Sequence, residues 1–157
     1  MSDAKGKCEE IYTRKNSLRL KDFDYSSSRV YFVTIVVSDR RDVFYNKELA
    51  KEVVDCLLSL REKLKFNLFG YCLMPNHFHA LIGIGEFEKD LGEVCGAFKS
   101  LTTRLYWKHA KGKLWQRGYH DHIIRNETDF FECLKYTKEN PQKKNLENWE
   151  FVGGLII

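Results

Sequence analysis

The chain has 157 residues, of which 43% are apolar, 14% aromatic and 31% charged, and its 26 basic and 22 acidic residues give a net charge of +4. This length suits one domain with one hydrophobic core, and the aromatic content excludes a disordered chain. No run approaches the roughly 20 apolar residues of a membrane helix, and the N-terminus lacks the apolar block of a secretory signal. We therefore expect a single soluble, cytoplasmic domain over residues 1–157.

Residues 1–24 are polar and basic and predict an N-terminal arm, whereas residues 142–157 form a C-terminal tail without a clear pattern. Between them, β-branched and aromatic runs predict strands, and apolar residues at spacings of three and four predict helices. Asn126 is a good N-cap for the last helix, and Pro141 disfavours helix at the residue before it. The predicted elements are a strand over 30–37, a helix over 47–65, strands over 66–73 and 77–84, a helix over 88–109, a strand over 119–125 and a helix over 127–140.

This order predicts an α+β fold of the ferredoxin-like, split β-α-β type, in which an antiparallel sheet carries two helices on one face. The third, C-terminal helix is additional, and the other face of the sheet is available to it. Helical periodicity places Leu101 on the inner stripe of the second helix. The predicted inner face of the last helix consists of Phe130, Phe131, Leu134 and Thr137.

The segment His77-Phe78-His79 is the most informative local pattern. Because side chains alternate across a strand, both histidines project to one face, while Phe78 and the apolar residues in step with it project to the helix-covered face. Two neighbouring imidazoles can serve as ligands for a divalent metal ion. The alternative interpretation is a pair of half-exposed histidines without a function.

Tyr136 and Asn140 lie four residues apart and fall together on the flank of the last helix, away from the centre of its inner stripe. A phenol has a reference pKa near 10, so it is a poor nucleophile at neutral pH without assistance. A metal ion held by two histidines could polarise a phosphodiester and stabilise the departing 3′ oxygen. Together these residues suggest a reaction that passes through a covalent phosphotyrosine.

Residues 97–118 contain six basic residues, no acidic residue and several aromatic ones. Such a stretch can neutralise phosphates and stack bases, although a solvated helix face would have a similar composition. The candidate DNA-binding residues are Lys99, Arg104, Trp107, Lys108, Lys111, Lys113 and Arg117.

Three segments resemble one family of proteins. The segment YCLMPNHFHALI (71–82) resembles the histidine motif of HUH single-tyrosine transposases. The segment LWQRGYHDHIIRNETDFFECLKYTKENP (114–141) is similar to the C-terminal block of their REP-associated tyrosine transposase branch, and DYSSSRVYFVTIVV (24–37) is similar to its first strand. The resemblance covers roughly residues 11–146, with the blocks in the expected order and spacing.

The resemblance implies an enzyme that nicks single-stranded DNA near an imperfect hairpin and forms a 5′-phosphotyrosine. It implies Mg²⁺ or Mn²⁺ on His77 and His79, Tyr136 as the nucleophile, and Asn140 as a candidate third ligand. His122 also matches the family pattern, and a hydrogen-bonding role near the site is expected for it. Residues after Pro141 depart from the family, which places terminal DNA contacts in question more than the chemistry.

Several alternatives remain open at this stage. His120 and His122 form a second H-x-H pair and hence a rival metal site. A ferredoxin-like sheet can also serve as a non-catalytic DNA- or RNA-binding module, for example in a domesticated transposase. The sequence does not distinguish a monomer from a homodimer that exchanges the tyrosine helix.

Overall fold

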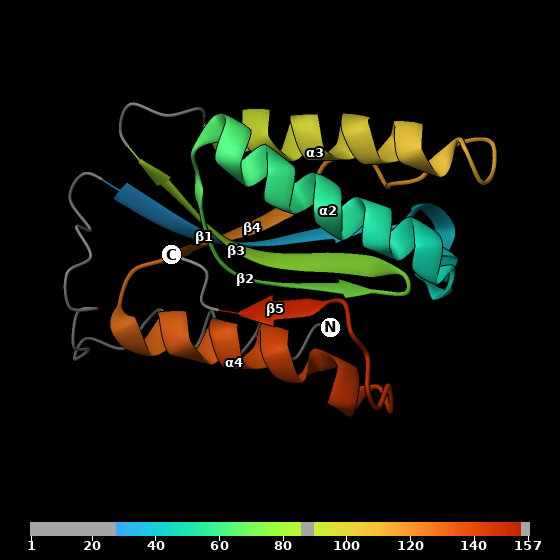
Figure 1. Ribbon diagram of the computed structural model, residues 1–157. Helices are drawn as coiled ribbons and strands as arrows, with labels where there is room; N and C mark the ends of the chain where they lie inside the picture. Colours follow the sequence, from blue (N-terminus) through green and yellow to red (C-terminus); the bar gives the residue numbers. More distant parts are fainter. Residues whose placement is uncertain (1–27, 86–89, 155–157) are drawn as a thin grey trace.

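The computed structural model describes residues 28–85 and 90–154 (Figure 1). The predicted order of strands and helices is confirmed within these ranges, and one more strand follows it. The N-terminal arm and the predicted start of the second helix at Glu88 lie outside the described residues. The elements are β1 (Ser28–Val36), the 3-10 turns η1 (Ser38–Arg40) and η2 (Val43–Tyr45), α2 (Lys47–Leu64), β2 (Asn67–Met74), β3 (His77–Gly85), α3 (Leu91–Tyr106), β4 (His120–Ile124), α4 (Glu127–Lys143) and β5 (Val152–Gly154).

The five strands form one sheet in the order β4-β1-β3-β2-β5, and all of its pairs are antiparallel. The strand β5 lies in the tail for which the sequence shows no clear pattern, and it pairs with β2 so that Gly153 faces Tyr71. A Cβ atom at Gly153 would overlap the Tyr71 ring. The missing side chain therefore allows this short edge strand to join the sheet.

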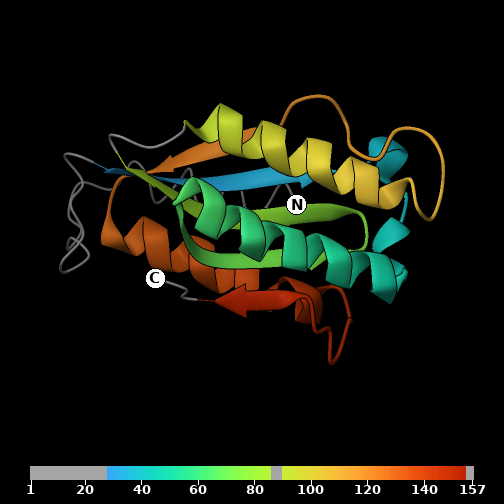
Figure 2. The same ribbon diagram turned by 45° about the horizontal axis from the view of Figure 1, so that its top comes forward.

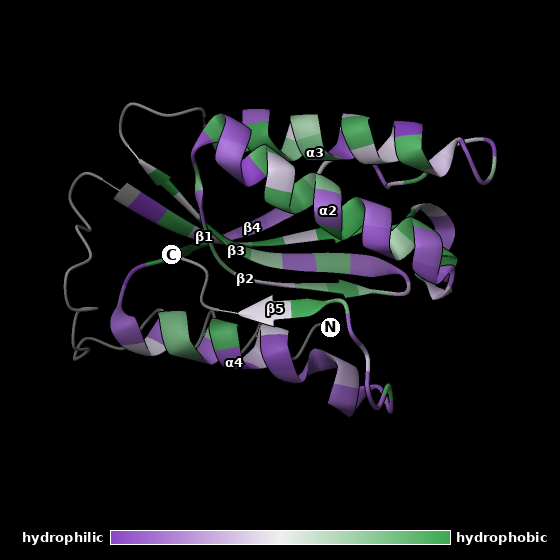
Figure 3. Cartoon of the chain, viewed as in Figure 1, coloured by the Kyte–Doolittle hydropathy of each residue, from purple (hydrophilic) through white to green (hydrophobic). Residues whose placement is uncertain are grey.

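The sheet separates two hydrophobic cores. Helices α2 and α3 cover one face and α4 covers the other, an arrangement that two views of the molecule show (Figures 1 and 2). Hydrophobic and hydrophilic residues alternate along each helix (Figure 3), because each helix buries only one of its sides. Phe78 lies in the core under α2 and α3, and Leu81 lies in the core under α4. The predicted alternation of side chains between the two faces of the sheet along β3 is confirmed.

Two predicted inner positions are wrong. Leu101 is 39% exposed, and the neighbouring Thr102 is buried instead, where its hydroxyl accepts a hydrogen bond from Trp115 Nε1 at 2.9 Å. Phe131 is 47% exposed, whereas Asn140 is buried. The side of α4 that packs against the sheet is therefore rotated away from Phe131 and includes the polar side chain of Asn140.

Helix α4 also continues through Pro141 to Lys143, beyond its predicted end at Asn140. Proline is tolerated there because it removes only one backbone hydrogen bond in the last turn, and its own ring is buried. Asn126 caps the helix as predicted, since its side chain accepts a hydrogen bond from the backbone N–H of Asp129 at 2.7 Å. Across the described ranges, no helix combines the length and the apolar character that crossing a membrane requires.

Candidate active site

The two histidines of β3 lie side by side on the face of the sheet that α4 covers. Their ring centroids are 4.6 Å apart, and the side chains are 3% and 2% exposed for His77 and His79. The Phe32 ring stacks on His79 at 5.2 Å and closes the site from β1. The alternative of two half-exposed, functionless histidines does not agree with this burial, because buried polar groups normally have a partner or a ligand.

Neighbouring polar groups orient both imidazoles through Nδ1. His77 Nδ1 donates to the Asn76 side-chain oxygen at 2.6 Å, and His79 Nδ1 lies 2.9 Å from the Thr34 hydroxyl. With the proton on Nδ1, the second ring nitrogen, Nε2, carries a lone pair. His79 Nε2 is buried and has no hydrogen-bond partner within the part of the chain that the structure describes.

Both histidines are held in the neutral form that binds metal ions. Burial, as the largest cause, and the positive charges of Lys144 and Arg40 together lower the pKa of His77 to about 4. Burial lowers the pKa of His79 well below its usual value, and the neighbouring His77 contributes to this shift. Because metal binding requires a deprotonated imidazole, neither ring has to lose a proton at neutral pH.

Helix α4 brings Tyr136 and Asn140 to the same place. The Tyr136 ring is half-buried and meets His79 edge to face, with ring centroids 5.6 Å apart. The Asn140 amide nitrogen lies 3.3 Å from His77 Nε2. The Lys143 ammonium lies over the Tyr136 ring, 5.2 Å from its centroid. One chain therefore places a phenol, two imidazoles and a carboxamide around one point.

These donors fit a divalent cation. Two imidazole nitrogens and one amide oxygen are common ligands of such ions, and a rotation of the Asn140 amide exchanges its nitrogen and oxygen. The unpartnered Nε2 of His79 supports this interpretation, because a buried nitrogen lone pair without a partner costs free energy unless a ligand occupies it. His77, His79 and Asn140 are the residues that could hold the ion.

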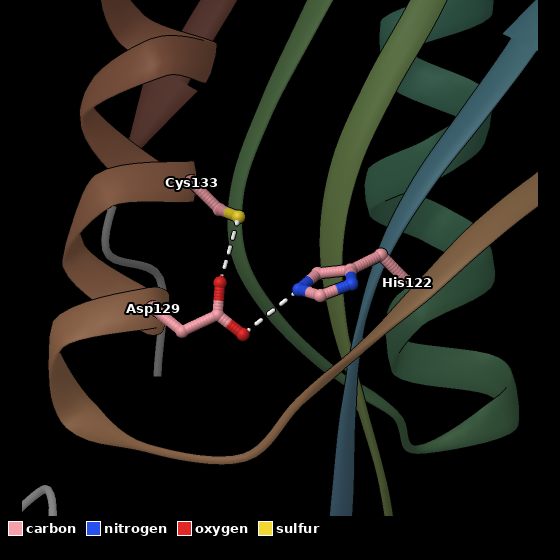
Figure 4. Close-up of side chains that lie close together, drawn as sticks. All are labelled: His122, Asp129 and Cys133. Carbon is pink, nitrogen blue, oxygen red and sulfur yellow. Dashed lines mark hydrogen bonds and ion pairs between the residues drawn. The ribbon is translucent and has the colours of Figure 1, made fainter. Parts of the chain in front are cut away.

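The second H-x-H segment, His120 and His122, does not place two buried imidazoles side by side. His120 is exposed, whereas His122 donates from Nε2 to the buried carboxylate of Asp129 at 2.8 Å. Cys133 Sγ lies 3.6 Å from the other oxygen of that carboxylate (Figure 4). Cys133 is disulfide-bonded and is therefore no thiolate ligand. The expected hydrogen-bonding role of His122 agrees with this geometry, which fastens α4 to the edge strand β4.

The predicted basic residues only partly share one surface. A groove of about 700 Å³ between α3 and the loop after it is lined by Lys99, Arg104, Trp107, Lys113 and Arg117, among others. Lys108 and Lys111 do not line it, and the Lys108 ammonium lies 3.6 Å from the Glu52 carboxylate. The Lys99 ammonium donates to two backbone oxygens of the loop, those of Gln116 and Gly118, each at 2.8 Å.

Trp107 is the aromatic residue of this groove that remains accessible. Its side chain is 57% exposed, and its indole nitrogen donates to the backbone oxygen of Gly112 at 2.8 Å. Trp115, in contrast, is buried under α3. Lys99 thus supports the loop, whereas Arg104, Trp107, Lys113 and Arg117 offer charge and an aromatic surface to a ligand.

Sequence reasoning missed the groups that orient the histidines. Thr34 is on a different strand, and only the pairing of Thr34 with His79 across β1 and β3 places its hydroxyl beside that ring. Asn76 directly precedes His77, in the turn between β2 and β3. A polar side chain next to a histidine pair was the one available signal.

Comparison with known proteins identifies relatives of this fold and sequence. The family described as Transposase IS200 like matches residues 25–140. A Haemophilus influenzae protein without an assigned function is 25% identical over 81% of this chain and 88% of its own length. A REP-associated tyrosine transposase of Escherichia coli is 23% identical over 81% and 77%. A solved structure of a REP-associated tyrosine transposase bound to a REP hairpin superposes with a TM-score of 0.66 at 18% identity, covering 88% of this chain and 79% of the other.

Proposed function

The chain belongs to the IS200-like transposase family, and from this premise we propose that it is a metal-dependent endonuclease and strand transferase for single-stranded DNA beside hairpins. The observation that supports this proposal most is the contact between the Tyr136 ring and His79, whose buried Nε2 has no partner among the described residues. A nucleophile and a metal-binding nitrogen are the two components that a phosphotyrosine reaction needs next to each other.

In the proposed reaction, the Tyr136 phenol oxygen attacks the phosphorus of the scissile phosphodiester and loses its proton. The P–O3′ bond breaks, and the departing 3′ oxygen takes up a proton, which leaves a free 3′-OH and a 5′-phosphotyrosine. Attack of a 3′-OH on this phosphotyrosine reverses the step and joins a new strand. The bond energy is conserved throughout, so no nucleotide cofactor is required.

We propose Mg²⁺ or Mn²⁺ as the ion and His77, His79 and Asn140 as its ligands. When bound, such an ion polarises the phosphodiester and offsets the charge that develops on the 3′ oxygen. Asn76 and Thr34 hold the two imidazoles with Nε2 available. The Lys143 ammonium over the Tyr136 ring holds the phenol on this flank of α4.

The proposed DNA contacts lie in the basic groove beside α3. Arg104, Lys113 and Arg117 would bind phosphates, and the exposed Trp107 ring would stack a base. The relative of known structure is bound to a REP hairpin, and a REP-like palindrome is the partner that we propose here. Since the tyrosine and the histidines meet within one chain, a monomer could act in cis.

The experiment that tests the proposal compares the wild-type protein with Tyr136→Phe on labelled hairpin DNA in Mn²⁺. We expect the wild type to form a covalent protein–DNA adduct that survives denaturing electrophoresis, and Tyr136→Phe to form none. Tyr31→Phe, a tyrosine packed against the other core, is the matched control and should form the adduct. An adduct with Tyr136→Phe would refute the assignment, and metal-independent binding without any adduct would favour a non-catalytic binding module.

A further inference from the structure

We propose that a hollow beside His77 is a subsite for the nucleotide that flanks the scissile phosphate, with Arg40 and Lys144 contacting its phosphates and Tyr45 stacking its base. This inference rests on the proposed function and extends it to residues that neither the motifs nor the basic stretch includes.

The hollow has a volume of about 310 Å³ and lies where three segments meet. The loop after β1, the turn between β2 and β3 and the end of α4 form its walls. His77 is part of its lining, although that side chain is 3% exposed. The hollow is therefore an opening next to the candidate metal ligands. Its volume is at the lower end of the range for small-molecule sites and suits one nucleotide rather than a duplex.

The charges of the hollow favour a phosphate. Arg40 and Lys144 line it, and both side chains are exposed. Among the residues that the structure describes, no hydrogen bond or ion pair occupies either charged group. Asp42 is the only carboxylate that residues 28–85 and 90–154 contribute to the lining, so two cations of these ranges face one anion. Both cations also act on His77, whose pKa they help to lower, and a phosphate would bring the opposite charge to the same place.

The loop that carries Arg40 is held in an unusual conformation. Asp39 and Arg40 have φ values of 58° and 51°, which are left-handed and rare for residues other than glycine. Arg41 fixes this loop, because its guanidinium donates to Ser38 O at 3.0 Å and to the Tyr106 hydroxyl at 2.8 Å. Arg41 is thus part of the support, and its neighbour Arg40 remains available for a ligand.

Two backbone bonds tie this loop to the turn that precedes His77. The Val37 N–H donates to Asn76 O at 2.9 Å, and the Phe44 N–H donates to Pro75 O at 3.0 Å. The same turn supplies the Asn76 side chain that orients His77. Because the loop and the metal ligands share this support, the hollow keeps a fixed position relative to the candidate metal centre.

Tyr45 adds an aromatic surface to the hollow and distinguishes a nucleotide from a simple anion. Its side chain is 56% exposed, and its ring meets Trp149 edge to face with centroids 6.0 Å apart. Trp149 holds the Tyr45 ring in place, and more than half of Tyr45 stays accessible. Such a ring can stack on any of the four bases. The chemistry of the hollow therefore matches a phosphate and a base together.

The test measures the binding of a fluorescein-labelled hairpin DNA with randomised single-stranded flanks, in EDTA so that no cleavage occurs, over a series of salt concentrations. We expect Arg40→Gln and Lys144→Gln each to reduce the slope of log K against log salt by about 0.7, the value for one lost phosphate contact on a single strand. Arg40→Lys should keep the wild-type slope. Tyr45→Ala should weaken binding about fivefold to a hundredfold without changing the slope.

Arg61→Gln and Lys63→Gln are the matched controls. Both residues lie in the last turn of α2, which precedes the start of β2, whereas the hollow lies at the end of β2. They should bind DNA as the wild type does. Adding Mn²⁺ should still raise the melting temperature of every variant, which shows that the metal ligands and the fold are intact.

The inference and the proposed function can fail separately. If the wild type forms the covalent adduct but Arg40→Gln and Lys144→Gln keep the wild-type salt slope, the subsite is refuted and the enzyme is not. If no adduct forms but both slopes fall, the hollow binds DNA and the proposed catalysis is refuted.

Discussion

The depressed pKa of His77 leads to a prediction about stability and pH. In the metal-free protein, burial and, to a smaller extent, nearby positive charges lower this pKa from 6.5 to about 4. Between these values the unfolded chain binds a proton that the folded chain does not, so acid favours unfolding. Protonation of His77 therefore does not reduce the free energy of unfolding above pH 6.5. As the pH falls from 6.5 to about 4, the free energy of unfolding decreases.

The size of the effect follows from the shift. One pKa unit corresponds to about 1.4 kcal/mol, and integration from pH 7 to pH 4.5 gives a loss of about 2 kcal/mol for His77 alone. His79 shifts in the same direction and adds to the loss. His77→Gln keeps a polar side chain of similar size but has no proton to bind, and its stability should fall less steeply with acid.

Urea denaturation of both proteins in EDTA, at pH 7 and at pH 4.5, measures the difference. We expect the wild type to lose about 2 kcal/mol more than His77→Gln. A second expectation concerns the metal. Since His77 is already neutral at pH 6, the Mn²⁺-induced stabilisation of the wild type should be nearly the same at pH 6 and pH 8. Equal acid sensitivity in the two proteins would refute the assignment of a buried, neutral His77.

Three further perturbations test other parts of the structure. Asn126→Ala removes the side-chain oxygen that caps α4, and thermal or urea unfolding should show a loss of about 1 kcal/mol; no loss would mean that the cap is unimportant. Gly153→Ala places a methyl group against the Tyr71 ring and should cost about 1–3 kcal/mol, with faster amide exchange in β5 as the local readout; unchanged exchange would contradict the packing argument. Trp107→Ala should weaken the binding of single-stranded DNA by about 1–3 kcal/mol, whereas Phe131→Ala, an exposed aromatic on α4, should not; equal effects would exclude stacking in the groove.

The sequence by itself determined which face each β3 side chain occupies, because alternation along a strand is a local property. It also determined the cap at Asn126, since an N-cap needs only its own first turn. The family was predicted from three motifs in register, and the match over residues 25–140 confirms it. These results depend on residues that are close in the chain.

Only the tertiary structure decided how deeply these side chains are buried and what they meet. Asn140 is buried because α4 rests on the sheet at an angle that the helical period alone does not set. The Thr34 hydroxyl reaches His79 through the pairing of β1 with β3, and β5 joins the sheet through a glycine that admits the Tyr71 ring. Arg40 and Lys144 are 104 positions apart in the numbering and meet at one hollow. Periodicity fixes a direction for each side chain, but the partner in that direction comes from a distant segment, and its position depends on how the whole chain packs.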